Sequence, residues 1–106
     1  MQFFKAHAYG NDFLYVKKDA ARGVAAEILA RELCDRHAGI GADGLILYEA
    51  TSDGASMRLF NADGSHAEVS GNGVRALGAL LLQREDHVQS TLTIHTDAGP
   101  KRLERI

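Results

Sequence analysis

Residues 61–85 read NADGSHAEVSGNGVRALGALLLQRE, and this stretch decides the fold that the sequence predicts. It opens with an Asn-Ala-Asp-Gly turn, followed by a short extended piece that ends at Val69. From Val74 to Leu82 almost every residue is apolar, whichever side of a helix it would face. Such a run is too long for one strand and is typical of a buried helix.

The start of this expected helix is suited to binding an anion. Ser70 stands where an N-cap residue belongs, and Gly71 and Gly73 have no side chain to cover the N–H groups of the first turn. Open N–H groups at the positive end of a helix attract a carboxylate or a phosphate. We therefore expect a binding site at this helix end.

Outside this stretch the chain is richer in strands than in helices. Strands are predicted over residues 3–8, 13–16, 45–48, 57–60, 91–96 and 101–106. One amphipathic helix is predicted over residues 24–37, with Val24 and Ile28 beside its buried face. Gly39 is expected to end that helix. A curved, mixed or antiparallel sheet wrapped around a central apolar helix buries that helix most simply, so we predict one α/β (α+β) domain over residues 1–106.

The composition excludes several classes of protein. The 106 residues carry 12 basic and 14 acidic side chains, interspersed along the chain, for a net charge of −2. This pattern offers neither a nucleic-acid-binding arm nor a membrane-binding face. We see no signal peptide and no run of ~18 apolar residues that would cross a membrane. Cys34 is the single cysteine, which excludes an internal disulfide and fits a reducing compartment such as the cytoplasm.

Two motifs have both a chemical and a plain structural interpretation. The sequence GIGADG at 39–44 matches the dinucleotide fingerprint G-x-G-x-x-G, but it follows a predicted helix and precedes a strand. The fingerprint needs the reverse order, so we interpret this segment as a glycine-rich turn. Ser70 is a possible nucleophile, but the hydrolase elbow G-x-S-x-G needs a glycine where Glu68 stands. We favour an N-cap role for the Ser70 hydroxyl.

The remaining polar residues allow two interpretations. The histidines are scattered without metal-ligand spacing, and Cys34 is expected to be buried, so we expect no metal site. Asn11, Asn61 and Asn72 each lie in a turn that contains glycine. Asparagine in such turns usually serves the backbone, but these three residues would also line one polar pocket if their turns meet.

Taken together, the longer motifs resemble the N-terminal half of the diaminopimelate epimerase family. The motifs are F-x-K-x-H-x-x-G-N-D-F at 3–13, C-D-R-H-x-G-I-G-A-D-G at 34–44, F-N-A-D-G-S at 60–65, S-G-N-G-x-R at 70–75 and T-x-A-G at 96–99. They span nearly the whole chain in the family's order. Each motif alone would be weak evidence, but the set is specific.

The resemblance implies a fold and a chemistry. Members of this family have two pseudo-symmetric halves, each a curved sheet around a central helix, with the substrate between them. They interconvert LL- and meso-diaminopimelate without a cofactor or a metal, in the synthesis of lysine and cell-wall precursors. Two cysteines, one from each half, face each other across the α-carbon of the substrate. One thiolate removes the α-proton, and the other thiol donates a proton from the opposite face.

The resemblance also assigns roles to particular residues. Asn11, Asn61, Gly71 and Asn72 would be substrate-binding positions, with the N–H groups of Gly71 and Asn72 binding the α-carboxylate. Ser70 stands at the catalytic position where the family has its first cysteine. A serine hydroxyl is a far weaker acid than a thiol. We therefore predict that this chain cannot carry out two-base epimerisation as it stands.

Three interpretations remain open at this stage. The chain is a module of a diaminopimelate epimerase, inactive by itself. Alternatively it is a half-sized relative that forms a homodimer through its exposed cleft face and serves as an amino-acid-binding protein or a scaffold. The third possibility is a paralogous isomerase, as in phenazine biosynthesis or proline racemisation. In every case we expect a small amino-acid ligand, a homo-oligomer, and neither nucleic acid nor membrane as a partner.

Overall fold

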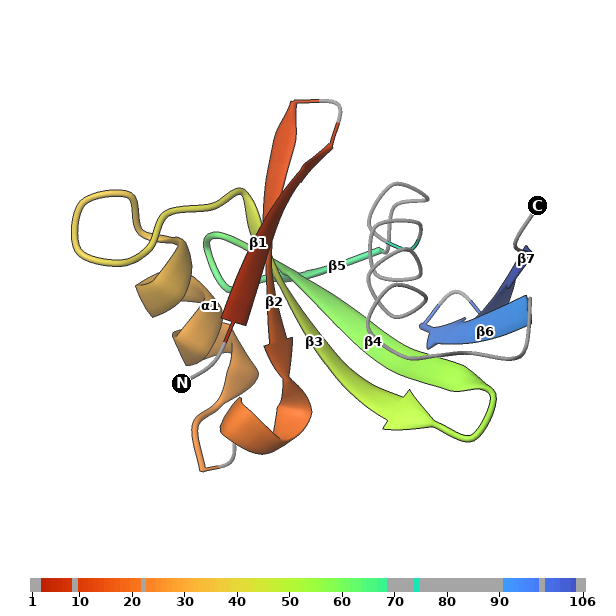
Figure 1. The fold of residues 1–106 in the computed structure, drawn as a ribbon. Helices are drawn as coiled ribbons and strands as arrows, with labels where there is room; N and C mark the ends of the chain where they lie inside the picture. The colour runs from red at the N-terminus through yellow and green to blue at the C-terminus, as the bar shows by residue number, and fades with distance from the viewer. Residues whose placement is uncertain are drawn as a thin grey trace.

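The computed structural model describes residues 3–8, 10–21, 23–68, 74, 91–97 and 99–104 (Figure 1). These residues form strands β1 (Phe3–Ala8), β2 (Asn11–Lys17), β3 (Gly44–Thr51), β4 (Gly54–Asn61), β5 (His66–Ala67), β6 (Thr91–Thr96) and β7 (Gly99–Glu104). They also form the 3-10 helix η1 (Lys18–Ala21) and the α-helix α1 (Ala26–Cys34). Within this described part, no helix is long and apolar enough to span a membrane.

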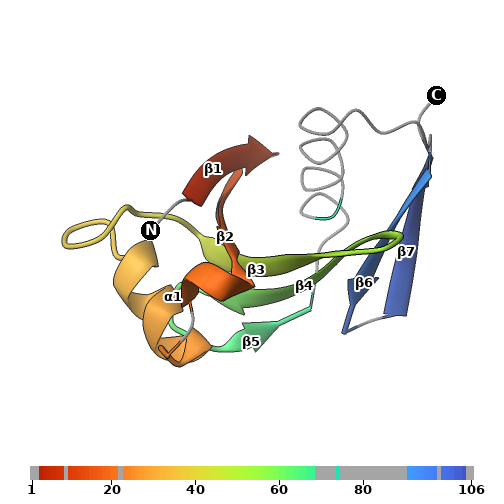
Figure 2. The ribbon, with the colours of Figure 1, turned by 60° about the horizontal axis from the view of Figure 1, so that its bottom comes forward.

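All the strands belong to one mixed sheet. Its order is β1-β2-β3-β4-β6-β7, with β5 paired to β4 beside β6. Strands β2 and β3 are parallel, as are β4 and β6, and the other pairs are antiparallel. Figure 2 shows that the sheet is strongly bent, so that β6 and β7 stand upright against the plane of β3 and β4. The predicted fold class, a curved mixed sheet in an α+β protein, is confirmed.

Alternation along the strands divides the core into two clusters, one on each face of the sheet. The first cluster contains Phe13, Tyr15, Ile46, Tyr48, Ala55, Met57, Leu59, Val74 and Ile94. The second contains Leu14, Val16, Ala21, Leu29, Ala30, Cys34, Ala42, Leu45 and Phe60. Helix α1 contributes only to the second cluster, so it covers one face, and Val74 lies on the other.

Helix α1 is shorter than the sequence predicts, and two apolar residues lie outside its buried face. Val24 precedes the first helical residue and is 45% exposed, while Ile28 is 44% exposed. The helix ends at Cys34 because Asp35 is extended (φ −63°, ψ 122°). The Asp35 carboxylate accepts hydrogen bonds from the N–H groups of His37 and Ala38, at 2.8 and 3.3 Å. Side-chain acceptors of this kind offer amides an alternative to the helix. Gly39 therefore does not end the helix.

The predicted strands are present, and those predicted at 13–16, 45–48 and 57–60 extend further at both ends. The strand predicted over 101–106 begins earlier, at Gly99, and residues 105 and 106 lie outside the described residues. Strand β1 has the predicted bounds, and the 57–60 strand grows to Gly54–Asn61 because the β3–β4 ladder continues to the Thr51–Gly54 pair. Val74, the first residue of the predicted apolar helix, is helical and buried. The rest of that helix lies outside the described residues.

Candidate functional site

Two of the predicted binding residues lie at the same end of the sheet. Asn11 is the first residue of β2, and Asn61 is the last residue of β4. In the register across the three central strands, Phe13 pairs with Gly44, and Gly44 pairs with Asn61. Asn11 stands two residues before Phe13 on the same strand. The fold therefore brings together two positions that are fifty residues apart in the sequence.

Asn11 and Asn61 also belong to the same face of the sheet. Asn11 alternates in step with Phe13, and Asn61 in step with Leu59, and both of those apolar residues belong to the first core cluster. Val74 packs in that cluster and directly follows the S-G-N-G motif. Ser70, Gly71 and Asn72, the other predicted site residues, lie outside the described residues.

Gly44 lies between the two asparagine-bearing strands in the register. A Cβ at this position would lie 3.3 Å from Cδ1 of Phe13 and 3.0 Å from the carbonyl oxygen of Phe60. A side chain at this position would therefore require its neighbours to shift, because Phe13 and Leu59 already pack against the strand here.

The Asn61 side chain is hydrogen-bonded to the turn that follows it in the sequence. Its amide nitrogen Nδ2 donates to Oγ of Ser65 at 2.9 Å. The Ser65 hydroxyl in turn donates to Oδ1 of Asp63 at 2.6 Å, and the Ser65 N–H donates to the same oxygen at 2.9 Å. Backbone bonds close the turn, from Asn61 N–H to Ser65 O at 2.8 Å and from Gly64 N–H to Asn61 O at 2.9 Å.

Asn11 is held by a different set of contacts, made by the residue next to it. The N–H of Asp12 donates to Oδ2 of Asp43 at 2.7 Å, and the N–H of Asp43 donates back to the Asp12 carbonyl at 2.9 Å. Arg36 donates to Oδ1 of Asp43 at 3.1 Å, and His7 pairs with the Asp12 carboxylate. The tip of the β1–β2 hairpin is therefore fastened to the start of β3 and to the end of α1.

Sequence reasoning missed these supporting residues. Ser65, Asp63 and Asp43 all lie inside motifs that the sequence displays, but their roles depend on turn geometry and on strand pairing. The one available signal was the Asp-Gly-Ser order after Asn61, since an aspartate two residues before a serine commonly accepts its N–H in a tight turn.

Four aspartates, of which three are exposed and Asp12 is half-buried, gain hydrogen bonds in the fold, and each has a lowered pKa. Donation by the Ser65 hydroxyl, and then by its N–H, lowers the pKa of Asp63. The hydrogen bond from His7 lowers the pKa of Asp12. The N–H groups after Arg36 lower the pKa of Asp35, and Thr51 followed by His95 lowers the pKa of Asp53.

These shifts predict that acid weakens the fold. A carboxyl group whose pKa is lower in the folded state takes up protons preferentially when unfolded, so its stabilising contribution is present above about pH 4 and is lost as the pH falls through the lowered folded pKa. We expect the urea midpoint to be level between pH 6 and about pH 4.5 and to fall below that. In Asp53→Asn the fall should be shallower, whereas an unchanged slope in this variant would contradict the assignment.

The GIGADG segment is a helix-capping turn. The N–H groups of Ile40 and Gly41 donate to the Leu33 carbonyl at 2.9 and 3.0 Å, and the N–H of Ala42 donates to the Cys34 carbonyl at 3.1 Å. Gly41 has a φ of 86°, which favours glycine. These amides satisfy the last carbonyls of α1 and are not available to a phosphate. The interpretation as a glycine-rich turn is confirmed.

Cys34, His66 and His95 have structural roles in the described part of the chain. Cys34 is 2% exposed, and burial raises the pKa of its thiol, so the prediction that it is buried is confirmed. His66 pairs with Asp97, and His95 Nε2 lies 3.1 Å from Oδ1 of Asp53. Among the described residues, no group of three or more histidine, cysteine, aspartate or glutamate side chains is placed to hold a metal ion.

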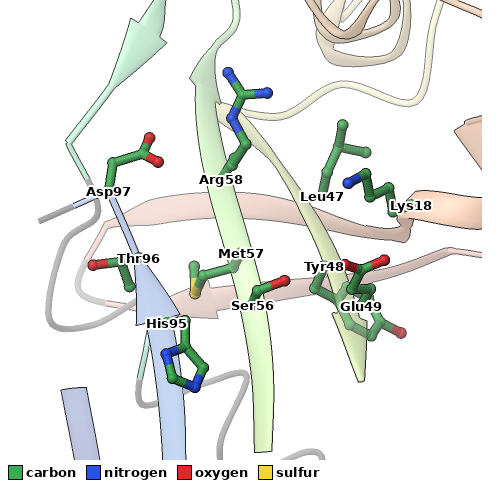
Figure 3. Close-up of a pocket in the computed structure, with 10 residues that line it drawn as sticks. All are labelled: Lys18, Leu47, Tyr48, Glu49, Ser56, Met57, Arg58, His95, Thr96 and Asp97. Carbon is green, nitrogen blue, oxygen red and sulfur yellow. The ribbon is translucent and has the colours of Figure 1, made fainter. Parts of the chain in front are cut away.

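A cavity of about 290 Å³ lies elsewhere on the sheet, near the turn between β3 and β4 (Figure 3). It is lined by Lys18, Leu47, Tyr48, Glu49, Ser56, Met57, Arg58, His95, Thr96 and Asp97. Leu47 and Arg58 are paired in the register, and both lie on the face of the sheet that α1 covers. The cavity contains none of the predicted site residues and carries charges of both signs, so it is separate from the asparagine site.

The comparisons with known proteins decide the family. The family model described as Diaminopimelate epimerase matches residues 3–105. The chain belongs to the diaminopimelate epimerase family. A diaminopimelate epimerase of Natranaerobius thermophilus is 43% identical over 109 residues, which cover 98% of this chain and 36% of that protein. The enzyme of Methanococcus maripaludis strain C6 is 43% identical over 106 residues, covering 98% of this chain and 38% of that protein.

The chain matches only part of the length of these relatives in the diaminopimelate epimerase family. The chain spans 36% and 38% of the length of the two curated relatives above. Among solved structures, a phenazine biosynthesis protein of the PhzF family from Enterococcus faecalis has a TM-score of 0.70 at 11% identity, covering 98% of this chain and 40% of that one. A PhzF family protein from Bacillus anthracis has a TM-score of 0.59 at 22% identity, covering 96% and 33%. These two likenesses support the fold.

Proposed function

We propose that this chain is the N-terminal, substrate-recognising half of a diaminopimelate epimerase. The observation that carries the proposal is the meeting of Asn11 and Asn61 at one end and on one face of the sheet, next to the buried Val74. These asparagines are the described members of the predicted binding set. Relatives 43% identical to this chain are named diaminopimelate epimerases.

The proposed chemistry needs no cofactor. Removal of an α-proton from an amino acid moves negative charge onto its carboxylate, and preorganised N–H donors at a helix start stabilise that charge. We assign this role to the N–H groups of Gly71 and Asn72, on the basis of the family motif. We assign Ser70 to the position of the residue that would exchange the proton, on one face of the α-carbon.

By this proposal the chain alone is not an active epimerase. The family reaction needs two proton-exchanging groups on opposite faces of the α-carbon, and this chain supplies only the position of Ser70. The second group belongs to the other half of the enzyme. We propose that the cleft face pairs either with that half or with a second copy of this chain, in the cytoplasm. Sedimentation that shows a monomer at high concentration would exclude the second copy.

Binding of diaminopimelate tests the proposal independently of proton transfer. The protein to use is this chain joined to the remaining C-terminal part of the Natranaerobius relative, hereafter the joined protein. Calorimetry should show Asn11→Ala and Asn61→Ala weakening the binding of diaminopimelate by about 10- to 100-fold, because each removes a hydrogen bond to a charged ligand group worth about 1.5–3 kcal/mol.

The matched control is Ser52→Ala, in the exposed β3–β4 turn at the opposite end of the sheet from Asn61. This variant should bind diaminopimelate as tightly as the parent protein. Equal affinities for the parent, Asn11→Ala and Asn61→Ala, with all three folded by circular dichroism, would refute the proposed site.

A further inference from the structure

We propose that Ser65 and Asp63 are positioning residues that fix the orientation of the Asn61 carboxamide. In this orientation its oxygen Oδ1 faces the ligand and accepts a hydrogen bond from an ammonium group. The inference deepens the proposed function and rests on it in one respect, that Asn61 contacts the ligand. The orientation itself follows from the hydrogen bonds of the turn.

The first step is the direction of the bond between Ser65 and Asp63. An ionised carboxylate can only accept hydrogen bonds. The Asp63 pKa is lowered by the Ser65 hydroxyl and N–H, so this carboxylate is ionised at neutral pH. The 2.6 Å contact between Ser65 Oγ and Asp63 Oδ1 is therefore donated by the serine, and it uses the single proton of the hydroxyl.

The second step is the direction of the bond between Ser65 and Asn61. With its proton committed to Asp63, Ser65 Oγ can only accept. Its 2.9 Å contact with the Asn61 side chain must then be donated by Nδ2. The flipped carboxamide would place Oδ1 against another acceptor and lose the bond. The orientation of an asparagine carboxamide is normally inferred from such networks. Here the Asp63 carboxylate can only accept, so the network allows a single orientation of Asn61.

The third step is the chemistry that this orientation offers to a ligand. The bond to Ser65 fixes Nδ2 on the turn side, so the opposite corner of the carboxamide, Oδ1, is the atom aimed away from the turn. An acceptor oxygen suits a donor, and an exposed one attracts an ammonium group and repels a carboxylate. Asp63 lies beyond Ser65, on the turn side of the carboxamide, and its part is to fix the direction of the hydrogen bonds. The hydrogen bonds of the turn thus favour an ammonium group as the ligand of Oδ1.

The orientation can be tested in the chain itself, without ligand, from the NMR signals of the Asn61 side-chain NH2. The parent should show one N–H proton shifted downfield and slowed in exchange, since it is bonded to Ser65. Ser65→Ala should lose this signature because the acceptor is gone. Asp63→Ala should weaken it, because the freed hydroxyl proton also allows the flipped carboxamide to accept from Ser65. Ser65→Thr, which keeps a hydroxyl, should retain it, as should the control Ser52→Ala.

The ligand preference can be tested in the joined protein with two probes, diaminopimelate and pimelate, the dicarboxylic acid of the same length without amino groups. Ser65→Ala should weaken diaminopimelate binding by about tenfold, the upper range for one hydrogen bond. The competition constant of pimelate should change less than twofold. Ser65→Thr should restore the affinity for diaminopimelate.

The outcomes separate the two proposals. An unchanged Asn61 signature in Ser65→Ala would overturn the fixed orientation, and equal weakening of both probes would reduce Ser65 to a structural role. If the signature behaves as expected but Asn61→Ala binds diaminopimelate like the parent, then the proposed function fails while the orientation stands.

Discussion

Ser70→Cys in the joined protein is expected to raise the rate of α-proton exchange of diaminopimelate with solvent deuterium by at least about a thousandfold. A thiol has a pKa near 8.5, so about a tenth of it is thiolate at pH 7.5. An alcohol without an adjacent base is a far weaker acid, with a pKa close to that of water. The difference in available base spans roughly seven orders of magnitude, and the greater intrinsic basicity of an alkoxide offsets only part of it.

By the proposed function the second cysteine belongs to the other half, so the parent joined protein is expected to lack exchange on one face of the α-carbon only. The isomer that presents its proton to Ser70 is therefore the informative substrate, and its exchange is measured by NMR in deuterium oxide. Ser70→Ala should be as slow as the parent, because neither offers a base. Parent exchange as fast as that of Ser70→Cys would show that another group acts as the base and would overturn the assignment of Ser70.

The introduced thiol can also be counted, because the chain has no other reactive cysteine. Cys34 is the single cysteine of this sequence, and as the last residue of α1 it is buried in the second core cluster with a raised pKa. In the isolated 106-residue chain, Ser70→Cys should therefore add one thiol that a colorimetric reagent titrates in the native state.

Local sequence patterns predicted the strands and helices of this fold better than they predicted which strands pair with each other. Strand β6 follows from the alternation of its residues, and strand β1 has the predicted bounds. The parallel pairs β2–β3 and β4–β6 have no local signal, because parallel strands are joined by long connections. Helix α1 was predicted too long because the extended Asp35 and the bonds to its carboxylate outweigh the apolar pattern.

The candidate site was predictable only in part for the same reason. Asn11 and Asn61 were identified through family motifs, but their meeting depends on the register through Gly44. The contribution of Ser65 depends on hydrogen bonds whose direction only the folded turn defines. Residue type and spacing indicated which side chains to examine, and the strand order determined which of them act together.

Gly39→Ala is expected to be strongly destabilising, lowering the free energy of unfolding by about 3 kcal/mol or more. A Cβ at this position would lie 2.1 Å from the carbonyl oxygen of Glu32 and 2.8 Å from that of Leu33. Both atoms belong to the backbone of the last turn of α1, so they cannot rotate away as a side chain would. The turn must move, and the Ile40 N–H bond to Leu33 is lost with it.

Gly23→Ala is the matched control, because it separates crowding from backbone strain. Gly23 has a φ of 87° and nothing within 4 Å of an added Cβ, so an alanine there bears only the cost of a left-handed conformation, about 1–2 kcal/mol. Gly39 is not one of the described glycines that have a positive φ, so the destabilisation expected for Gly39→Ala comes from crowding alone. Urea unfolding followed by far-ultraviolet circular dichroism should place the midpoint of Gly39→Ala clearly below that of Gly23→Ala. The reverse order would mean that the 39–44 turn is easily deformed and does not fix the end of α1. The support inferred for the hairpin that carries Asn11, through Asp43, would then be contradicted as well.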